Sequence, residues 1–273
     1  MNVRLDFKLP GQACADVGSI SMAELVRSTS REIECRTVML DHRPVMLGEL
    51  CRVTRGGANE NELVLCGDTG QLAFAGRCMR AGRLLVEGDA GFGAGADLRG
   101  GEIEILGNAA GNLGVGMQSG LIRLHGCAGD WCGAAYPGQS RGMSGGMILI
   151  TGYAGDCLGL GMRRGLIFVG GDAGESCAEG LLAGTVLVAG SVGRYAGRGM
   201  RRGSLVAGRM APPLPGFRPA GQADPEWLRI YALALRRMGV ALPAAWLERP
   251  LHRFTGDHLE LGKGEVLIDE LIE

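Results

Sequence analysis

The chain has 273 residues, 49 of them glycine, with 46% hydrophobic residues and a formal net charge of −1. This charge argues against general nucleic-acid binding, and the lack of an 18-residue apolar run argues against a membrane span. Charged side chains within the first 30 residues argue against a signal peptide. The nine cysteines include no C-x-x-C pair and are expected to be small buried side chains. We therefore expect a cytoplasmic protein.

Residues 1–66 precede a repeat and are interpreted as an N-terminal cap that covers an open strand edge. Two stretches have the alternation typical of strands, Val3–Leu9 and Val45–Thr54. Between them, Met22–Ile33 is expected to form a helix, with Ser21 as its N-cap and Glu24 completing a capping box.

A glycine-centred phrase recurs through the middle of the chain at intervals of 19 residues, with one interval of 26. Its glycines are Gly82, Gly101, Gly120, Gly146, Gly165, Gly184 and Gly203. Met or Leu precedes each of them, in a column from Met79 to Met200 that we interpret as core packing. Aliphatic residues follow two and four positions later, as in Leu84 and Val86, which is typical of a strand with one buried face.

A fixed period near 20 residues indicates a stacked repeat. Nineteen residues are too few for a βαβ unit, which needs about 30, but suffice for short strands joined at glycine corners. The pattern therefore predicts an all-β fold in which residues 67–210 form a parallel β-helix, a solenoid of about seven 19-residue coils.

The 26-residue interval contains seven extra residues, Ala135–Arg141, and insertions in stacked repeats often form a binding face. A cluster of arginines lies in the same part of the sequence. We select five of them as candidate contacts for an acidic ligand tail or an acidic partner surface: Arg141, Arg163, Arg164, Arg201 and Arg202. A solvated charged edge is the alternative interpretation.

Residues 211–273 begin with a proline-rich stretch. Asp224 and Pro225 are expected to start a helix over about 225–238, which ends at Gly239. An extended tail follows. The helix and tail are interpreted as a docking arm for partner chains or as a C-terminal cap on this chain's own coils, and the two are not exclusive.

Motifs for catalysis are sparse. The coils contain one histidine, His125, and with Cys127 and Cys132 it is the best available zinc site, but a second ligand pair is lacking. No H-E-x-x-H motif occurs. We therefore expect no catalytic residue and no metal site in this chain.

Three phrases resemble those of the third subunit (designated C) in the formylmethanofuran dehydrogenase family: Gly-Asp-Ala-Gly at 88–91, Arg-Gly-Met-Ser-Gly-Gly at 141–146, and Gly-Lys-Gly-Glu at 262–265. The glycine coil also resembles the C-terminal domain of the glutamate synthase large subunit. The resemblance covers roughly residues 45–268 and implies a right-handed β-helix in a non-catalytic subunit beside catalytic partner chains.

For one branch of this family, the resemblance implies a bacterial formyltransferase/hydrolase complex that converts formyl-tetrahydromethanopterin to formate through a methanofuran-type cofactor with a glutamate-rich tail. The transferase and the metal-dependent hydrolase are then partner subunits. The arginine-rich, lysine-poor composition favours this bacterial form. The alternatives are the third subunit of an archaeal formylmethanofuran dehydrogenase, a glutamate-synthase-type structural domain or stand-alone binding protein, and a polysaccharide-active enzyme.

Overall fold

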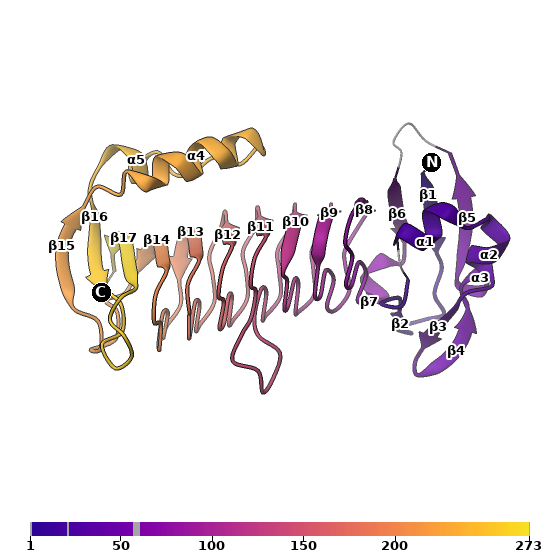
Figure 1. Cartoon of the computed structure of the whole chain (residues 1–273), viewed down its shortest axis with the longest axis horizontal. Helices are drawn as coiled ribbons and strands as arrows, with labels where there is room; N and C mark the ends of the chain where they lie inside the picture. The colour runs from indigo at the N-terminus through magenta and orange to yellow at the C-terminus, as the bar shows by residue number, and fades with distance from the viewer. Residues whose placement is uncertain (1, 21, 57–60, 273) are drawn as a thin grey trace.

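A computed structural model describes residues 2–20, 22–56 and 61–272. Within these ranges a long row of strands forms one large sheet, and a second small sheet lies at the N-terminal end (Figure 1). The strands of the large sheet are β1 (Val3–Phe7), β5 (Cys51–Arg55), β6 (Glu62–Gly67), β8 (Arg83–Val86), β9 (Arg99–Ile105), β10 (Ser119–Leu124), β11 (Met147–Ile150), β12 (Leu166–Val169), β13 (Thr185–Val192), β14 (Ser204–Met210), β15 (Pro219–Ala223), β16 (Leu251–Thr255) and β17 (Glu265–Leu271).

Their order in the described 13-stranded sheet is β15-β16-β17-β14-β13-β12-β11-β10-β9-β8-β6-β1-β5. From β1 through β17 the neighbours pair in parallel, and antiparallel pairs occur at the two edges. The small sheet has the order β4-β3-β2-β7 and is mainly antiparallel. Its strands are β2 (Ala15–Asp16), β3 (Thr37–Leu40), β4 (Arg43–Met46) and β7 (Leu72–Ala73), the last preceded by the 3-10 turn η1 (Thr69–Gln71).

The prediction of an all-β solenoid, a right-handed parallel β-helix of about seven 19-residue coils, is wrong. The structure is one large, mostly parallel sheet with a small second sheet and a few helices. Each repeat contributes one strand to the large sheet, and its remaining residues return through turns. Neighbouring turns are joined by isolated bridges such as Ala90–Ala109. Residues with positive φ, such as Gly93, Gly95 and Asp97, interrupt each returning segment, so it does not extend into further strands.

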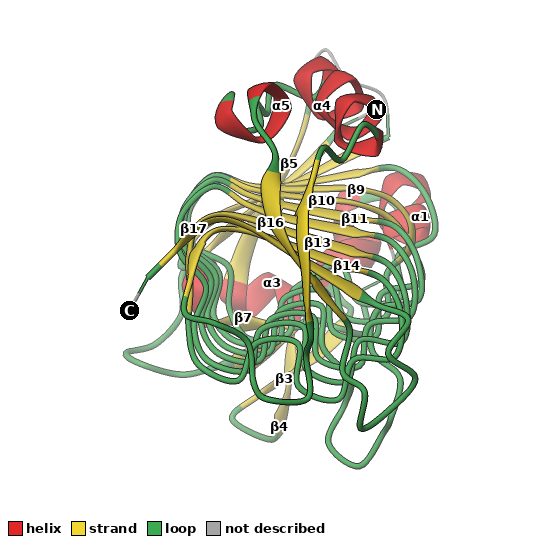
Figure 2. Ribbon diagram, turned by 90° about the vertical axis from the view of Figure 1, so that its left-hand side faces the viewer, coloured by secondary structure: helices red, strands yellow, loops and turns green. Residues whose placement is uncertain are grey.

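Equivalent aliphatic side chains lie opposite one another in the large sheet. Leu84 pairs with Ile103, Ile103 with Ile122, and Ile122 with Ile148. Their side chains are at most 1% exposed. The column from Met79 to Met200 is buried in the same core, so its interpretation as core packing is confirmed. Figure 2 shows the strands and turns of successive repeats superimposed along the row.

Aspartates at the corners hold neighbouring repeats together. The Oδ1 atom of Asp89 accepts a hydrogen bond from the backbone N–H of Asn108 at 2.7 Å, and Asp172 accepts one from Ser191 at 2.7 Å. Asp130 is bonded in the same way to the next repeat. These carboxylates satisfy backbone donors that the turns leave without a strand partner.

The N-terminal segment departs from the predicted elements. The predicted helix 22–33 is divided into α1 (Met22–Arg27) and α2 (Ser30–Glu34). The division occurs because Thr29 forms its own capping box with Glu32, and this starts a new helix. The predicted cap at Ser21 lies outside the described residues. The predicted strand 45–54 is also interrupted, by the short helix α3 (Leu47–Leu50) between β4 and β5.

At the other end, the helices α4 (Trp227–Arg237) and α5 (Ala245–Glu248) cover the outer face of the sheet near β12 to β14 (Figure 1). Leu228, Leu235 and Trp246 pack there in a second buried cluster with sheet residues such as Phe168 and Val206. The predicted helix over about 225–238 is thereby confirmed, but it begins at Trp227 with Glu226, not Asp224, at the N-cap. The tail returns as β17, which pairs in parallel with β14, so it caps this chain's own sheet.

None of the helices in the described ranges is long and apolar enough to cross a membrane. The expected boundaries of the three regions, 1–66, 67–210 and 211–273, stay predictions.

The corner glycines generate a test of the repeat packing. A Cβ on Gly165, where φ is +106°, would lie 2.6 Å from the Gly146 carbonyl oxygen, whereas on Gly180, where φ is +62°, its nearest neighbour would be 3.9 Å away. We expect Gly165→Ala to lower the free energy of unfolding by about 3 kcal/mol. The control Gly180→Ala carries only the cost of a left-handed backbone, about 1 kcal/mol. Urea denaturation measures both, and equal losses would contradict the close approach of the two repeats.

Candidate functional site

The insertion at 135–141 forms a loop that projects between β10 and β11 (Figure 1). Its base is fixed to earlier repeats. The Tyr136 hydroxyl donates a hydrogen bond to Asp97 Oδ2 at 2.7 Å. The Tyr136 ring packs over Gly116, where a Cβ would lie 3.0 Å from the ring. Burial, together with the Asp97 hydrogen bond, raises the pKa of Tyr136, so the phenol stays a neutral donor.

A groove of about 500 Å³ adjoins this loop. Gln139, Ser140 and Arg141 form the wall on the side of the insertion. Three glycines from successive repeats lie along the groove: Gly161, Gly180 and Gly199. Because these positions have no side chain, the groove can accommodate an extended chain close to the backbone. We call this feature the glycine groove.

The tail of the chain supplies the opposite wall through Glu260. Asp257 is 4% exposed and fixes this wall. Its Oδ2 accepts a hydrogen bond from the Gly199 N–H, and its Oδ1 accepts one from the Leu259 N–H, both at 2.9 Å. In the preceding repeat, the Gly180 N–H donates to the carbonyl of Arg198 instead. Asp257 therefore replaces the missing next repeat at the end of the ladder.

The charges of the glycine groove come from three arginines and two glutamates, a net charge of +1. Arg198 pairs with Glu179, and Arg201 Nε lies 2.9 Å from Glu260 Oε2. Arg141 is exposed and has no ion pair with the described residues. A carboxylate that enters the groove would therefore meet one arginine without a carboxylate partner and two that are each already paired with a glutamate.

The structure brings together two of the five predicted site residues. Arg141 and Arg201 line the glycine groove. Arg163, Arg164 and Arg202 are exposed but do not line it. Arg163 occupies the same turn position as Arg201, one residue after the Met and Leu column, but Arg201 pairs with Glu260 of the groove wall.

Three charged residues that line the groove were not among the predicted site residues: Glu179, Arg198 and Glu260. Glu179 precedes Arg198 by one 19-residue period, so their adjacency could have been inferred from the repeat itself. Glu260 lies beyond the repeat, in the tail, and no periodic signal marks it. Arg198 is close in sequence to the predicted arginines, but its position in the groove wall depends on the 19-residue spacing that places it beside Glu179.

The candidate zinc ligands from the sequence, His125, Cys127 and Cys132, do not form a metal site. Cys132 is 1% exposed, and burial raises the pKa of its thiol to about 12. His125 instead has its Nε2 atom 2.8 Å from Glu104 Oε1, within a charged network that includes Arg83. Across residues 2–20, 22–56 and 61–272, no group of three or more His, Cys, Asp or Glu side chains is placed to hold a metal ion.

Comparison with known proteins gives one informative result. No protein-family model and no curated protein matches the chain. Among solved structures, the chain is similar to a chain in the X-ray crystal structure of the formyltransferase/hydrolase complex (FhcABCD) from Methylorubrum extorquens in complex with methylofuran. The two share 32% sequence identity with a TM-score of 0.84, over 98% of this chain and 99% of the other.

The chain belongs to the family of that component of the complex. The extent of the match includes the insertion, the groove and the tail, because nearly all of both chains is aligned. The resemblance to the third subunit in particular stays a prediction, as does the cytoplasmic location.

The anchoring of the insertion loop is testable. Tyr136→Phe removes the hydrogen bond to Asp97, which contributes about 1 kcal/mol. If this energy holds the loop, trypsin should cleave after Arg141 about fivefold faster in the variant. Tyr153→Phe is the matched control, since Tyr153 is 58% exposed. Equal cleavage rates in the two variants would contradict the anchoring role.

Proposed function

We propose that this chain is a non-catalytic structural component of a formyltransferase/hydrolase complex and that it corresponds to the third subunit of the formylmethanofuran dehydrogenase family. The observation that carries the proposal is the similarity to a chain of such a complex over nearly the full length of both proteins. A shared fold alone does not fix a function, so the proposal rests on the 32% sequence identity over 98% of this chain and 99% of the other. The phrases at 88–91, 141–146 and 262–265 support the choice of the third subunit.

In the proposed complex, formyl-tetrahydromethanopterin is converted to formate through a formyl-methanofuran-type cofactor. Transferase and hydrolase chemistry belongs to partner chains, and the metal is held by the hydrolase. Four potentially reactive side chains have structural tasks or burial that support this division. The carboxylates of Asp89 and Asp172 bind backbone N–H groups of the next repeat. Burial raises the pKa of the Cys132 and Cys177 thiols to about 12, which keeps them protonated and poorly nucleophilic.

The glycine groove is the part of this chain that we propose to contact an acidic group. The candidate occupants are the glutamate-rich tail of the cofactor and an acidic surface of a partner protein. Arg141 has no carboxylate partner in the described structure, and a guanidinium pairs with a carboxylate in a two-pronged geometry. Arg163 and Arg164 are exposed and follow the groove residue Gly161 closely in sequence, so they add positive charge to this part of the chain.

The first test is the composition of the native assembly. A tagged version of the chain, expressed in its own cells, is expected to co-purify with a transferase chain and a metal-dependent hydrolase chain, identified by mass spectrometry. The isolated chain is expected to release no formate from formyl-tetrahydromethanopterin. Recovery with molybdenum or tungsten and iron–sulfur proteins, or with a glutamine amidotransferase, would contradict the proposal in favour of the two related families.

The second test addresses the arginines. Arg141→Glu and the double change Arg163→Glu with Arg164→Glu are expected to weaken either cofactor binding or assembly of the complex at least about tenfold, because each lost charge-assisted hydrogen bond contributes about 1.5–3 kcal/mol. Loss of cofactor from an intact complex indicates the cofactor tail, and loss of a partner chain indicates a partner surface.

Arg99→Glu is the matched control, since Arg99 is exposed at the same repeat position as Arg163 but lies in β9, before β10 and the insertion. Unchanged assembly and cofactor content in the Arg141→Glu and Arg163→Glu/Arg164→Glu variants would contradict the proposed role of the arginines. Such a result would not affect the assignment of the chain to the complex.

A further inference from the structure

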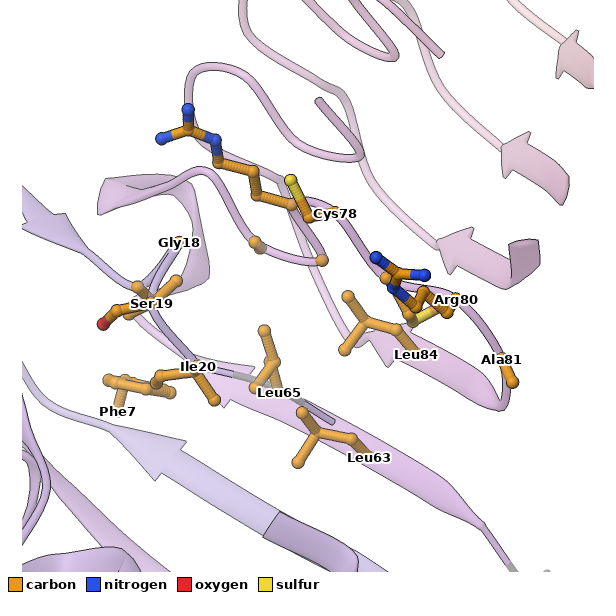
Figure 3. A pocket seen from close by; sticks show the side chains of 15 residues that line it. Phe7, Gly18, Ser19, Ile20, Leu63, Leu65, Cys78, Arg80, Ala81 and Leu84 are labelled. Carbon is orange, nitrogen blue, oxygen red and sulfur yellow. The ribbon is translucent and has the colours of Figure 1, made fainter. Parts of the chain in front are cut away.

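A second pocket lies at the opposite end of the row of strands. It has a volume of about 350 Å³ and is lined mainly by apolar side chains. Figure 3 shows Leu63, Leu65 and Leu84 around it, with Phe7 and Ile20 on one side and Arg80 and Ala81 on the other. It therefore lies between the N-terminal segment and the first repeat, far along the sheet from the glycine groove.

The pocket has a physical origin in how the repeat begins. The sheet continues past the first repeat, because β8 pairs with β6 and β6 with β1. The column of Met and Leu side chains does not continue in the same way, since Met79 is its first member. The segment 17–20 covers the position where an earlier member would lie, but it leaves space against Met79 and Ala75. The unfilled space is thus the open end of the core.

The walls of this pocket are suited to an aliphatic chain. Leu63, Leu65 and Leu84 are each at most 4% exposed, and Met79 is 7% exposed. Apolar cavities of this kind bind apolar molecules readily, since filling them restores lost packing contacts. A volume of roughly 300–1,000 Å³ with a few polar groups at the rim is also the usual description of a small-molecule site.

The rim carries two arginines with different partners. The Arg77 guanidinium lies over the Phe74 ring at 5.3 Å, and its Nε is 3.9 Å from Asp97 Oδ2. Arg80 is exposed and has no ion pair with the part of the chain that the structure describes. It lies beside Leu84 and Ala81 at the mouth (Figure 3). A single unpaired guanidinium at the mouth of an apolar pocket favours a ligand with one terminal anion.

We propose that this pocket binds a medium-chain aliphatic carboxylate, with the alkyl chain among Leu63, Leu65, Leu84 and Met79 and the carboxylate on Arg80. The proposed role in the formyltransferase/hydrolase complex does not depend on this pocket. The ligand-binding proposal can therefore be tested independently of that role.

Isothermal titration of the full chain with hexanoate, octanoate, decanoate and dodecanoate tests the apolar part. Each added methylene is expected to raise the affinity about fourfold until the pocket is filled, after which the affinity levels off. The alcohols of equal length are expected to bind more weakly than the carboxylates. Absence of saturable binding across the series would overturn the proposal, as would equal affinities for acids and alcohols.

Three variants locate the site. Arg80→Ala is expected to reduce carboxylate affinity at least about tenfold and to leave alcohol affinity unchanged. Arg99→Ala, the same repeat position one repeat later and outside the pocket lining, is expected to change neither. Ala81→Trp, an exposed rim position, should reduce binding of both ligand series.

Thermal melting confirms that each variant is folded before titration. Equal carboxylate affinities in Arg80→Ala and Arg99→Ala, or full binding in Ala81→Trp, would place the ligand elsewhere and overturn the proposal.

Discussion

The parallel, in-register pairing of one short strand per repeat is the constraint on which the rest of the structure depends. Side chains such as Ile103, Ile122 and Ile148 lie opposite one another only if each turn returns the chain by the same path. The corner glycines make that path possible, because at Gly165 a Cβ would collide with the carbonyl of the previous repeat. The aspartates then fix the spacing by binding the next backbone N–H. Register, burial and turn geometry are therefore parts of one requirement.

The glycine groove is a consequence of the same requirement. Gly161, Gly180 and Gly199 form a column without side chains because all three occupy one turn position. The groove has walls because two segments depart from the repeat. The insertion carries Arg141 on one side, and the tail carries Glu260 on the other, fixed by Asp257 at the end of the ladder. In the proposed complex, the regular part supplies rigidity, and the two irregular segments supply the contacts.

The 19-residue repeat predicts which residues are buried and which form strands. It does not predict how many strands each repeat forms or which distant segments come into contact. The buried Met79 to Met200 column and the alternating strands follow from spacing alone. The number of strands per repeat does not, since the same spacing fits one sheet or several, and the β-helix prediction was wrong for that reason. The helix boundary at Thr29 could have been found from Thr29 and Glu32. The contacts of Tyr136 with Asp97 and of Glu260 with Arg201 join segments 39 and 59 residues apart, which no local pattern reveals.

Amide hydrogen exchange followed by mass spectrometry tests the central claim of in-register parallel pairing most directly. Strands β9 to β13 are each paired on both sides, so the account predicts slow amide exchange in all of them, with one common free energy of opening. Between these strands, fast exchange is expected in the exposed part of the insertion. Slow exchange confined to the helices between residues 227 and 248, with rapid exchange in those strands, would contradict it.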